Sequence, residues 1–507
     1  MRTDFTDSLR NGLRPVEYAG KNVQFLQTAN NILCTQFGLT AHEIIQQLIA
    51  SGELTANSIT VSHPYPQVFK GKGVTLLCTA TKVYTVNEST WTLTQLTTYD
   101  LRNSANAHSI PSGGVWHFAD FHTSWFLFNG ACTVMKTGWV DSTKTLVQDE
   151  QTMKTGCDFR GQLIIGGLAS DFWTAEWQTL WGTLTPQGTA WSYSLGSPGQ
   201  NWLWWSSIGG GDIGALFLSS LAVNDLGSVT GGHDSDRPFI VDMMRRVESS
   251  MMPMDFQGTI LRVEPLRNAV VVYGEDGVSA IFPASSPVPT FGLEDNLLSV
   301  GIAARNAVCS DGINQFFVDA EGFLWSITPT LQLQKLGYQE YLSPMLGNDI
   351  TLFYDRTRQR CHITDGVDSY VLFEGRLSKQ AQIPTALLNV DGGLAGLYET
   401  EADESVLVKT TPFDLGTRKA KTIYSVELSM DDPTGATMII YYRDDVLSSF
   451  TASETFTVDT RGETVVLVTG VEFYIAILCT SSVGFEVTGL FVNVAEGGKV
   501  DLRRNLT

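Results

Sequence analysis

Three carboxylates in glycine-containing turns, Asp276, Asp319 and Glu321, are the first candidates for chemistry. Glycoside hydrolysis needs two carboxyl groups across a cleft, one as the acid and the other as the base or nucleophile. Acidic residues beside glycine also stabilise turns by accepting backbone hydrogen bonds. The turn setting favours this structural role, and glycan cleavage is kept as an alternative.

Histidines and cysteines do not form a metal-binding pattern. His117 and His122 are five residues apart on a strand-rich stretch, so they would point to opposite faces of a strand. No two cysteines form a C-x-x-C pair, which argues against a zinc site or a disulfide framework. Most lie in apolar runs and are interpreted as small buried side chains. The seven are Cys34, Cys78, Cys132, Cys157, Cys309, Cys361 and Cys479.

Gly209-Gly210-Gly211-Asp212 precedes a predicted helix and could hold an anion at the helix N-terminus. Asp212 as an N-cap after a flexible connector is the favoured interpretation. No phosphate-binding loop, H-E-x-x-H or G-x-S-x-G motif occurs. We therefore predict no catalytic, cofactor-binding or metal-binding residue, and no enzyme.

The tryptophans could form a platform for sugar rings. Packing between sheets or at a subunit interface is favoured over that role. The residues concerned are Trp173, Trp177, Trp181, Trp191, Trp202, Trp204 and Trp205.

The elements that would position these residues are short strands joined by turns. In the second half, three hairpins have their turn glycines, Gly277, Gly322 and Gly366, at spacings of 45 and 44 residues. Such a period is typical of β-propeller blades. In the first half, strands are expected at residues 74–78, 82–86, 125–128, 132–136 and 162–165.

Counting one blade per hairpin predicts an all-β fold: a β-propeller of about six blades over residues 61–400. Its blades centre near residues 80, 130, 165, 275, 320 and 365. A partly helical insertion is expected near 185–260, with helices over 212–222 and 237–249. An acidic linker is expected near 399–405, followed by a β-sandwich over 411–507 with a frayed basic tail.

Residues 1–60 are predicted to form an arm with a short helix from Thr40 to Gly52. Its apolar residues Ile44, Ile45, Leu48 and Ile49 fall at helical spacing. Such an arm has no core of its own, so these side chains must pack on the propeller itself or on a neighbouring subunit.

Composition limits the class of protein further. The chain of 507 residues has a formal net charge of −20, which disfavours general binding to nucleic acid or to anionic membranes. No apolar run reaches the roughly 18 residues that a membrane-spanning helix needs. Residues 1–10 lack the apolar core of a secretory signal, so synthesis and folding in a cytoplasm are expected.

The order of several segments resembles the tail nozzle, or tail hub, proteins of short-tailed bacteriophages, including packaged-DNA stabilisation proteins. The resemblance spans residues 10–400 and lies in the general character and the order of the segments. It rests on Gly12-Leu13-Arg14-Pro15, residues 115–130 (VWHFADFHTSWFLFNG), 160–167 (RGQLIIGG), 204–209 (WWSSIG), 252–258 (MPMDFQG) and 319–323 (DAEGF).

This resemblance implies a structural virion protein that forms a homo-oligomeric ring, a hexamer, around exiting DNA. The implied partners are the adaptor and portal proteins above it and tail fibre or tailspike proteins. Six copies would bring six times −20, or −120, formal charges. Such charge would let phage DNA pass through the lumen without specific binding. The alternatives are a carbohydrate-binding or glycan-cleaving β-propeller and a monomeric scaffold or receptor-type propeller.

Overall fold

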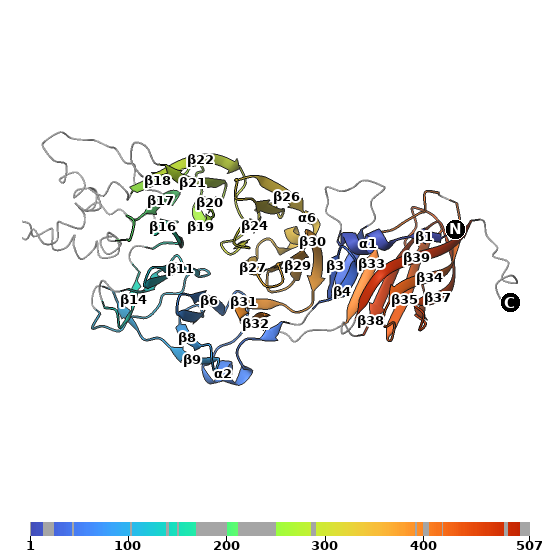
Figure 1. Ribbon diagram of the computed structural model, residues 1–507, viewed down its shortest axis with the longest axis horizontal. Helices are drawn as coiled ribbons and strands as arrows, with labels where there is room; N and C mark the ends of the chain where they lie inside the picture. The colour runs from blue at the N-terminus through green and yellow to red at the C-terminus, as the bar shows by residue number, and fades with distance from the viewer. Residues whose placement is uncertain are drawn as a thin grey trace, which may run out of the picture.

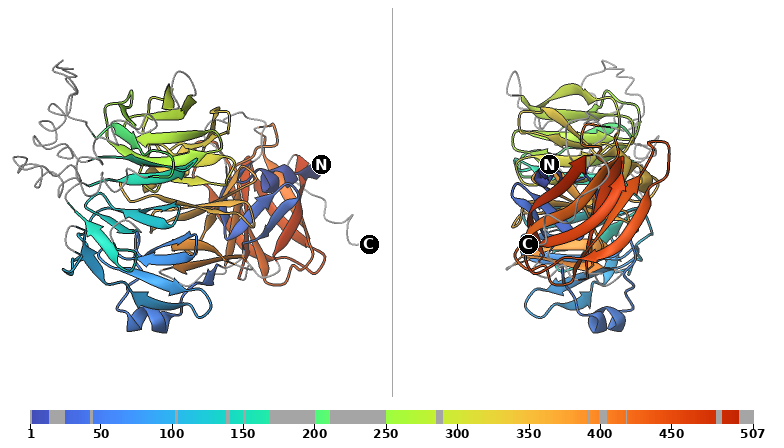
Figure 2. Two further views of the ribbon diagram at one scale, coloured as in Figure 1. Left: turned by 60° about the vertical axis from the view of Figure 1, so that its left-hand side comes forward. Right: turned by 90° about the vertical axis from the view of Figure 1, so that its right-hand side faces the viewer.

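The protein is described by a computed structural model that covers most of the chain. The described residues are 2–13, 25–42, 45–101, 104–137, 141–149, 152–168, 200–210, 250–284, 290–390, 393–398, 405–417, 419–480 and 485–496. Across these residues the chain is all-β, as predicted. Figure 1 shows a ring of sheets beside a second unit of long strands, in which the N-terminus lies, and the left view of Figure 2 shows the same two units side by side.

Seven sheets of the described residues form the ring. The first is β6 (Gln67–Gly71), β7 (Val74–Cys78), β8 (Val83–Asn87) and β9 (Thr92–Gln95). The second is β11 (His117–Phe121), β12 (Ser124–Phe128), β13 (Thr133–Lys136), β14 (Thr145–Gln148) and β10 (Thr98–Asp100). The third is β15 (Thr155–Phe159), β16 (Gln162–Gly166), β17 (Trp202–Trp205) and β18 (Ser250–Pro253).

The remaining sheets of the ring follow in chain order. The fourth is β19 (Ile260–Leu266), β20 (Ala269–Gly274), β21 (Val278–Ala284) and β22 (Thr290–Leu298). The fifth is β23 (Val308–Ser310), β24 (Gln315–Val318), β25 (Leu324–Ile327) and β26 (Leu333–Gly337). The sixth is β27 (Thr351–Asp355), β28 (Arg360–Thr364), β29 (Ser369–Phe373) and β30 (Arg376–Gln380). The seventh is β31 (Pro384–Val390), β32 (Gly393–Tyr398) and β5 (Gln46–Gln47).

The predicted hairpins are confirmed, whereas the predicted count of about six blades is not. The pairs β7–β8, β12–β13, β20–β21, β24–β25 and β28–β29 all lie at the predicted positions. The described part of the predicted insertion supplies β17 and β18 to the third sheet. The helices predicted over 212–222 and 237–249 lie outside the described residues.

The seventh sheet joins strands from opposite ends of the ring segment. Strand β5 pairs in parallel with β32, with Gln46 opposite Ala395. The backbone N–H of Leu48 donates to the carbonyl of Gly396 at 2.8 Å. This pairing holds the last sheet beside the first through a segment about 350 residues away.

The predicted helix over residues 40–52 is wrong. Strand β4 (Gly38–Ala41) covers its start and β5 its middle, and the short helix α2 (Ser51–Ala56) begins only at its end. Ile45, Leu48 and Ile49 are buried within the chain, while Ile44 lies outside the described residues. The unpaired edge of β32 accepts this segment as a strand, so long-range pairing overrides the helical spacing.

Two further short helices of the ring are α6 (Gln339–Leu342) and η2 (Ser343–Met345).

The second unit is a sandwich of two sheets, and the N-terminal segment belongs to it rather than forming a separate arm. One sheet is β3 (Ile32–Thr35), β4, β39 (Glu486–Glu496), β34 (Lys421–Met430) and β37 (Glu463–Gly470), with β1 (Arg2–Asp4) beside β39. The other is β2 (Leu26–Asn30), β33 (Val406–Thr410), β38 (Glu472–Cys479), β35 (Ala436–Arg443) and β36 (Thr451–Thr457). The strands that lie in the segment predicted to form a β-sandwich are β34, β35, β36, β37, β38 and β39.

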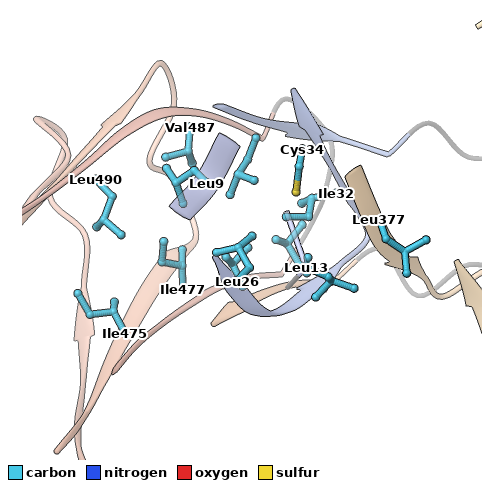
Figure 3. Close-up of a cluster of buried hydrophobic side chains, with 14 of the residues drawn as sticks. Leu9, Leu13, Leu26, Ile32, Cys34, Leu377, Ile475, Ile477, Val487 and Leu490 are labelled. Atoms are coloured by element: carbon cyan, nitrogen blue, oxygen red, sulfur yellow. The ribbon is translucent and has the colours of Figure 1, made fainter. Parts of the chain in front are cut away.

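Strand β2 joins the sandwich to the ring. Its Asn30 is paired with Lys379 of β30 on one side and with Leu407 of β33 on the other. Helix α1 (Thr6–Asn11) covers the junction with the buried Leu9. Figure 3 shows Leu9 and Leu26 among side chains from both units, including Leu377 and Ile477. An apolar N-terminal segment of this kind is stable only when it is packed between larger sheets.

Candidate functional site

The centre of the ring contains a cavity of about 630 Å³. Residues of β6, β11, β15, β19, β23, β27 and β31, the first strands of all seven sheets, line it. Pockets of this size are typical of small-molecule sites. Its polar lining residues are Lys70, His117, Asp120, Asp158, Arg262, Glu264, Ser310, Tyr354, Arg356 and Asn389.

An ionic group formed by Arg262 and Glu264 lies inside the cavity. The two residues are two positions apart on β19, so the alternation of a strand places them on one face. The Nε of Arg262 donates to Oε1 of Glu264 at 2.7 Å, and its second terminal nitrogen lies 2.5 Å from the same oxygen. Its first terminal nitrogen donates to Oδ1 of Asn306 at 3.2 Å.

His117, at the start of β11, faces this group as a neutral imidazole. The Oγ1 of Thr155 accepts the backbone N–H of Val263, so its hydroxyl proton can be donated to Nδ1 of His117, 2.6 Å away. The backbone N–H of Gly156 also donates to Nδ1. The remaining ring nitrogen, Nε2, therefore carries the proton and lies 3.5 Å from Oε1 of Glu264.

Burial and neighbouring charge fix the ionisation of this cluster. Burial lowers the pKa of His117 to about 4, and the positive charge of Arg262 acts in the same direction. Burial alone would raise the pKa of Glu264, but Arg262 and the contact with His117 outweigh it and lower that pKa to about 2. At neutral pH the cavity therefore contains a neutral histidine beside a carboxylate and a guanidinium.

The remaining charged groups of the cavity differ in how fully they are bonded. Nζ of Lys70 contacts Glu88 at 2.7 Å. Asp120 accepts the backbone N–H of Lys72 at 2.6 Å. The guanidinium of Arg356, just after β27, donates no hydrogen bond to any described residue.

The carboxylates singled out from the sequence lie outside this cavity. Asp319 is only 1% exposed; its Oδ1 accepts the backbone N–H groups of Glu321 and Phe323, and its Oδ2 accepts Nε1 of Trp325 at 2.7 Å. Asp276 accepts the N–H of Gly258 at 2.9 Å. The turn-stabilising interpretation is confirmed for Asp319, whereas Asp276 bonds to the segment before β19 rather than to its own turn.

Replacing Asp319 with Ala is expected to destabilise the protein by about 2–4 kcal/mol, because three donors lose a buried acceptor. Glu321→Ala is the matched control, because its side chain is exposed on the same turn. Chemical denaturation of both variants measures the difference. Equal stabilities would show that the three hydrogen bonds of Asp319 contribute nothing.

The other sequence candidates are also accounted for where the structure describes them. Trp204 and Trp205 are buried between sheets, and the ring of Trp205 meets Phe291 edge to face at 5.2 Å. Packing is thus confirmed over a sugar platform for these two, and Trp202 is half-buried against the same apolar cluster as Trp204. His122 lies in the turn after β11, away from His117. Trp173, Trp177, Trp181, Trp191, Gly211 and Asp212 lie outside the described residues.

The part of the chain that the structure describes contains neither a metal-binding cluster nor a membrane-spanning helix. Among these residues no group of three His, Cys, Asp or Glu side chains could hold a metal ion. Within the same residues no helix is long and apolar enough to span a bilayer. Six of the seven free cysteines are buried and Cys479 is half-buried, which agrees with their interpretation as apolar side chains.

Arg262, Glu264 and His117 were not identified as a group from the sequence. The signal that could have shown them is the alternation of Arg262 and Glu264 along a strand that is otherwise largely apolar. Because Arg262 and Glu264 face the interior of the ring of sheets, the centre of that ring must be polar. His117 could not be assigned to the same centre without knowing that β11 and β19 both line it.

Acid is expected to weaken the fold through two buried histidines. The pKa values of His117 and His362 are both about 4, mainly because burial disfavours the charged ring. In the unfolded chain a histidine titrates near pH 6.5. Between pH 6.5 and 4 the unfolded state therefore binds more protons, and the stability falls as the pH falls, by about 3 kcal/mol for each histidine.

Thermal melting at pH 7 and pH 4.5 tests this. His362→Gln, which can still bond with Gln380, is expected to lose less stability on acidification than the wild-type protein. His122→Gln, at an exposed position, is the control and should behave like the wild type. The same acid-induced loss in all three proteins would contradict the assignment.

Comparison with known proteins shows a likeness in fold only. A scan against models of protein families finds no match, and neither does a search of curated proteins. The extracellular domain of the system BT4673 from B. thetaiotaomicron is 10% identical, with a TM-score of 0.40 over 96% of this chain and 64% of that one. The Neurospora crassa Pan2 WD40 domain is 7% identical, with a TM-score of 0.34 over 69% of this chain and 90% of that one.

Another solved structure, apo AztD from Citrobacter koseri, is 9% identical, with a TM-score of 0.33 over 80% of this chain and 89% of that one. This chain spans less than two thirds of the two BT4673 chains that it matches. The assignment of the chain to the all-β class rests on its own sheets. These likenesses carry nothing about function.

Proposed function

We propose that the chain is a structural virion protein: a subunit of a ring-forming tail nozzle of a short-tailed bacteriophage. Six copies form a ring below the portal and adaptor, enclose the channel through which DNA leaves, and help to retain packaged DNA. Within each copy the seven sheets act as the blades of a closed propeller. The proposal is supported by the resemblance described above and by a free strand edge on the sandwich.

The free strand edge is the observation that carries the proposal. Strand β37 is the last strand of its sheet and pairs with β34 alone among the described strands. Its outward side chains include Val465, 73% exposed, and Leu467, 54% exposed. A long apolar edge strand is a site for pairing with another chain unless it is protected. A second copy of this chain is the partner that a ring requires.

The junction between the two units supports the same role. Because β2 is paired with strands of both units, the sheet of the sandwich continues into the sixth sheet of the ring. A subunit that surrounds a channel must hold its surfaces in fixed positions. Continuous hydrogen bonding across the junction provides this stiffness.

Charge suits a lumen through which DNA passes without specific binding. The net charge of −20 per chain repels phosphate, so DNA would be separated from the wall by water and counterions.

In the proposed assembly the further partners are the portal and adaptor proteins and the tail fibre or tailspike proteins. Assembly takes place in the bacterial cytoplasm, and no enzymatic step is required.

The double variant Val465→Asp with Leu467→Asp is expected to abolish self-association, because like charges on a shared edge repel. Sedimentation velocity measures the oligomer, and thermal melting shows that the fold is retained, since both side chains are exposed. Ile313→Asp with Val367→Asp is the control: these residues are similarly exposed but lie on the ring of sheets. A wild-type protein that stays monomeric, or a β37 variant that still associates, would contradict the proposal.

A further inference from the structure

We propose that the central cavity binds one neutral sugar residue, either a free monosaccharide or the end of a glycan. This inference goes beyond the proposed virion role and does not depend on ring assembly. It rests on the balance of charge in the cavity, on unused hydrogen-bonding groups and on an aromatic wall.

The charges that line the cavity are balanced. They comprise three cationic and three acidic side chains: Lys70, Arg262, Arg356, Asp120, Asp158 and Glu264. An anionic ligand would face the three carboxylates, and a cationic ligand would face the three cations. A neutral ligand that both donates and accepts hydrogen bonds matches this mixed lining, and a polyhydroxylated ring does both at each hydroxyl.

Several of these groups have bonding capacity left. Arg262 has five N–H groups and uses three of them, on Glu264 and Asn306. Oε2 of Glu264 accepts no hydrogen bond from any described residue, since both of its partners contact Oε1. One sugar hydroxyl could accept from Arg262 while donating to Oε2 of Glu264. The guanidinium of Arg356, which donates no hydrogen bond to any described residue, supplies further donors.

An apolar wall completes the site. The rings of Phe69 and Phe118 both line the cavity and stack with their centroids 5.8 Å apart and their planes 16° from parallel. Both side chains are half-buried, so apolar surface remains on this side. The C–H face of a pyranose packs against such surface, while its hydroxyls reach the polar groups. The volume of about 630 Å³ leaves room for a ring of this size with water.

Saturation-transfer NMR with the full-length protein tests the proposal, and titration calorimetry quantifies any binding. The probes are glucose, galactose, mannose, rhamnose and N-acetylglucosamine, each offered free and as its methyl glycoside. At least one neutral sugar is expected to bind. Tighter binding of the free sugar identifies a monosaccharide as the ligand, and equal binding of the glycoside identifies a glycan end. Glucuronate and inorganic phosphate are expected to bind at least tenfold more weakly.

Variants locate the binding. Arg356→Ala and Glu264→Gln are each expected to weaken it at least tenfold. Arg461→Ala, an exposed arginine on the sandwich, should leave it unchanged. Arg356 is exposed, so its variant carries the test even where Glu264→Gln fails to fold.

Three results would overturn the proposal: no neutral sugar binds, a bound sugar is unaffected by Arg356→Ala, or an anionic probe binds more tightly than every neutral one. None of these results bears on self-association, which sedimentation measures separately. Failure of the sugar site is therefore distinguishable from failure of the virion role.

Discussion

Replacing Ile45 and Leu48 together with Asp is expected to abolish the fold of the ring. Leu48 is buried in the core between the seventh and first sheets, and Ile45 packs against Leu387 and Leu394. Placing a carboxylate at either position combines the loss of apolar burial with an unpaired buried charge. Each change costs about 4 kcal/mol or more, and the pair consumes most of the 5–15 kcal/mol that stabilises a typical domain.

Circular dichroism and thermal melting measure this outcome. The control is Gln46→Asp with Gln47→Asp, which alters the two exposed residues between the buried positions. The control should melt close to the wild type. A double variant of Ile45 and Leu48 that melts like the wild type would show that β5 does not close the ring.

Replacing Leu26 with Asp is the second change with a large expected effect. Leu26 is fully buried on β2, the strand that joins the sandwich to the ring (Figure 3). A loss of about 4–5 kcal/mol is expected, with unfolding of the sandwich before the ring. Gln27→Asp is the matched control, because the neighbouring side chain points to the exposed face. Limited proteolysis that cleaves the Leu26 variant no faster than the control would contradict the prediction.

Local strand pairs could be predicted because their signals are local. The hairpin β20–β21, for example, has apolar, partly β-branched residues on either side of a turn that contains Gly277. The turn of Asp319 was likewise interpreted correctly, since the acidic side chain and the groups that it bonds are neighbours in the sequence. Each of these features depends on fewer than about twenty consecutive residues.

Features that need distant segments were missed. The seventh sheet combines residues 46–47 with 384–398, and the sandwich takes β1 to β4 from the N-terminal segment. A helical spacing of Ile45, Leu48 and Ile49 cannot show that an edge strand elsewhere will pair with them. The candidate site was missed for the same reason, because each of seven separate strands contributes only one to four residues to the cavity.

Immunogold electron microscopy of purified phage particles is the most direct test of the proposed virion role. The antibody would be raised against this protein, and the particles would come from a phage whose genome encodes it. The proposal predicts gold at one site on each particle, the tail, below the portal. Unlabelled particles, with the protein detected by the same antibody in lysed host cells, would contradict it.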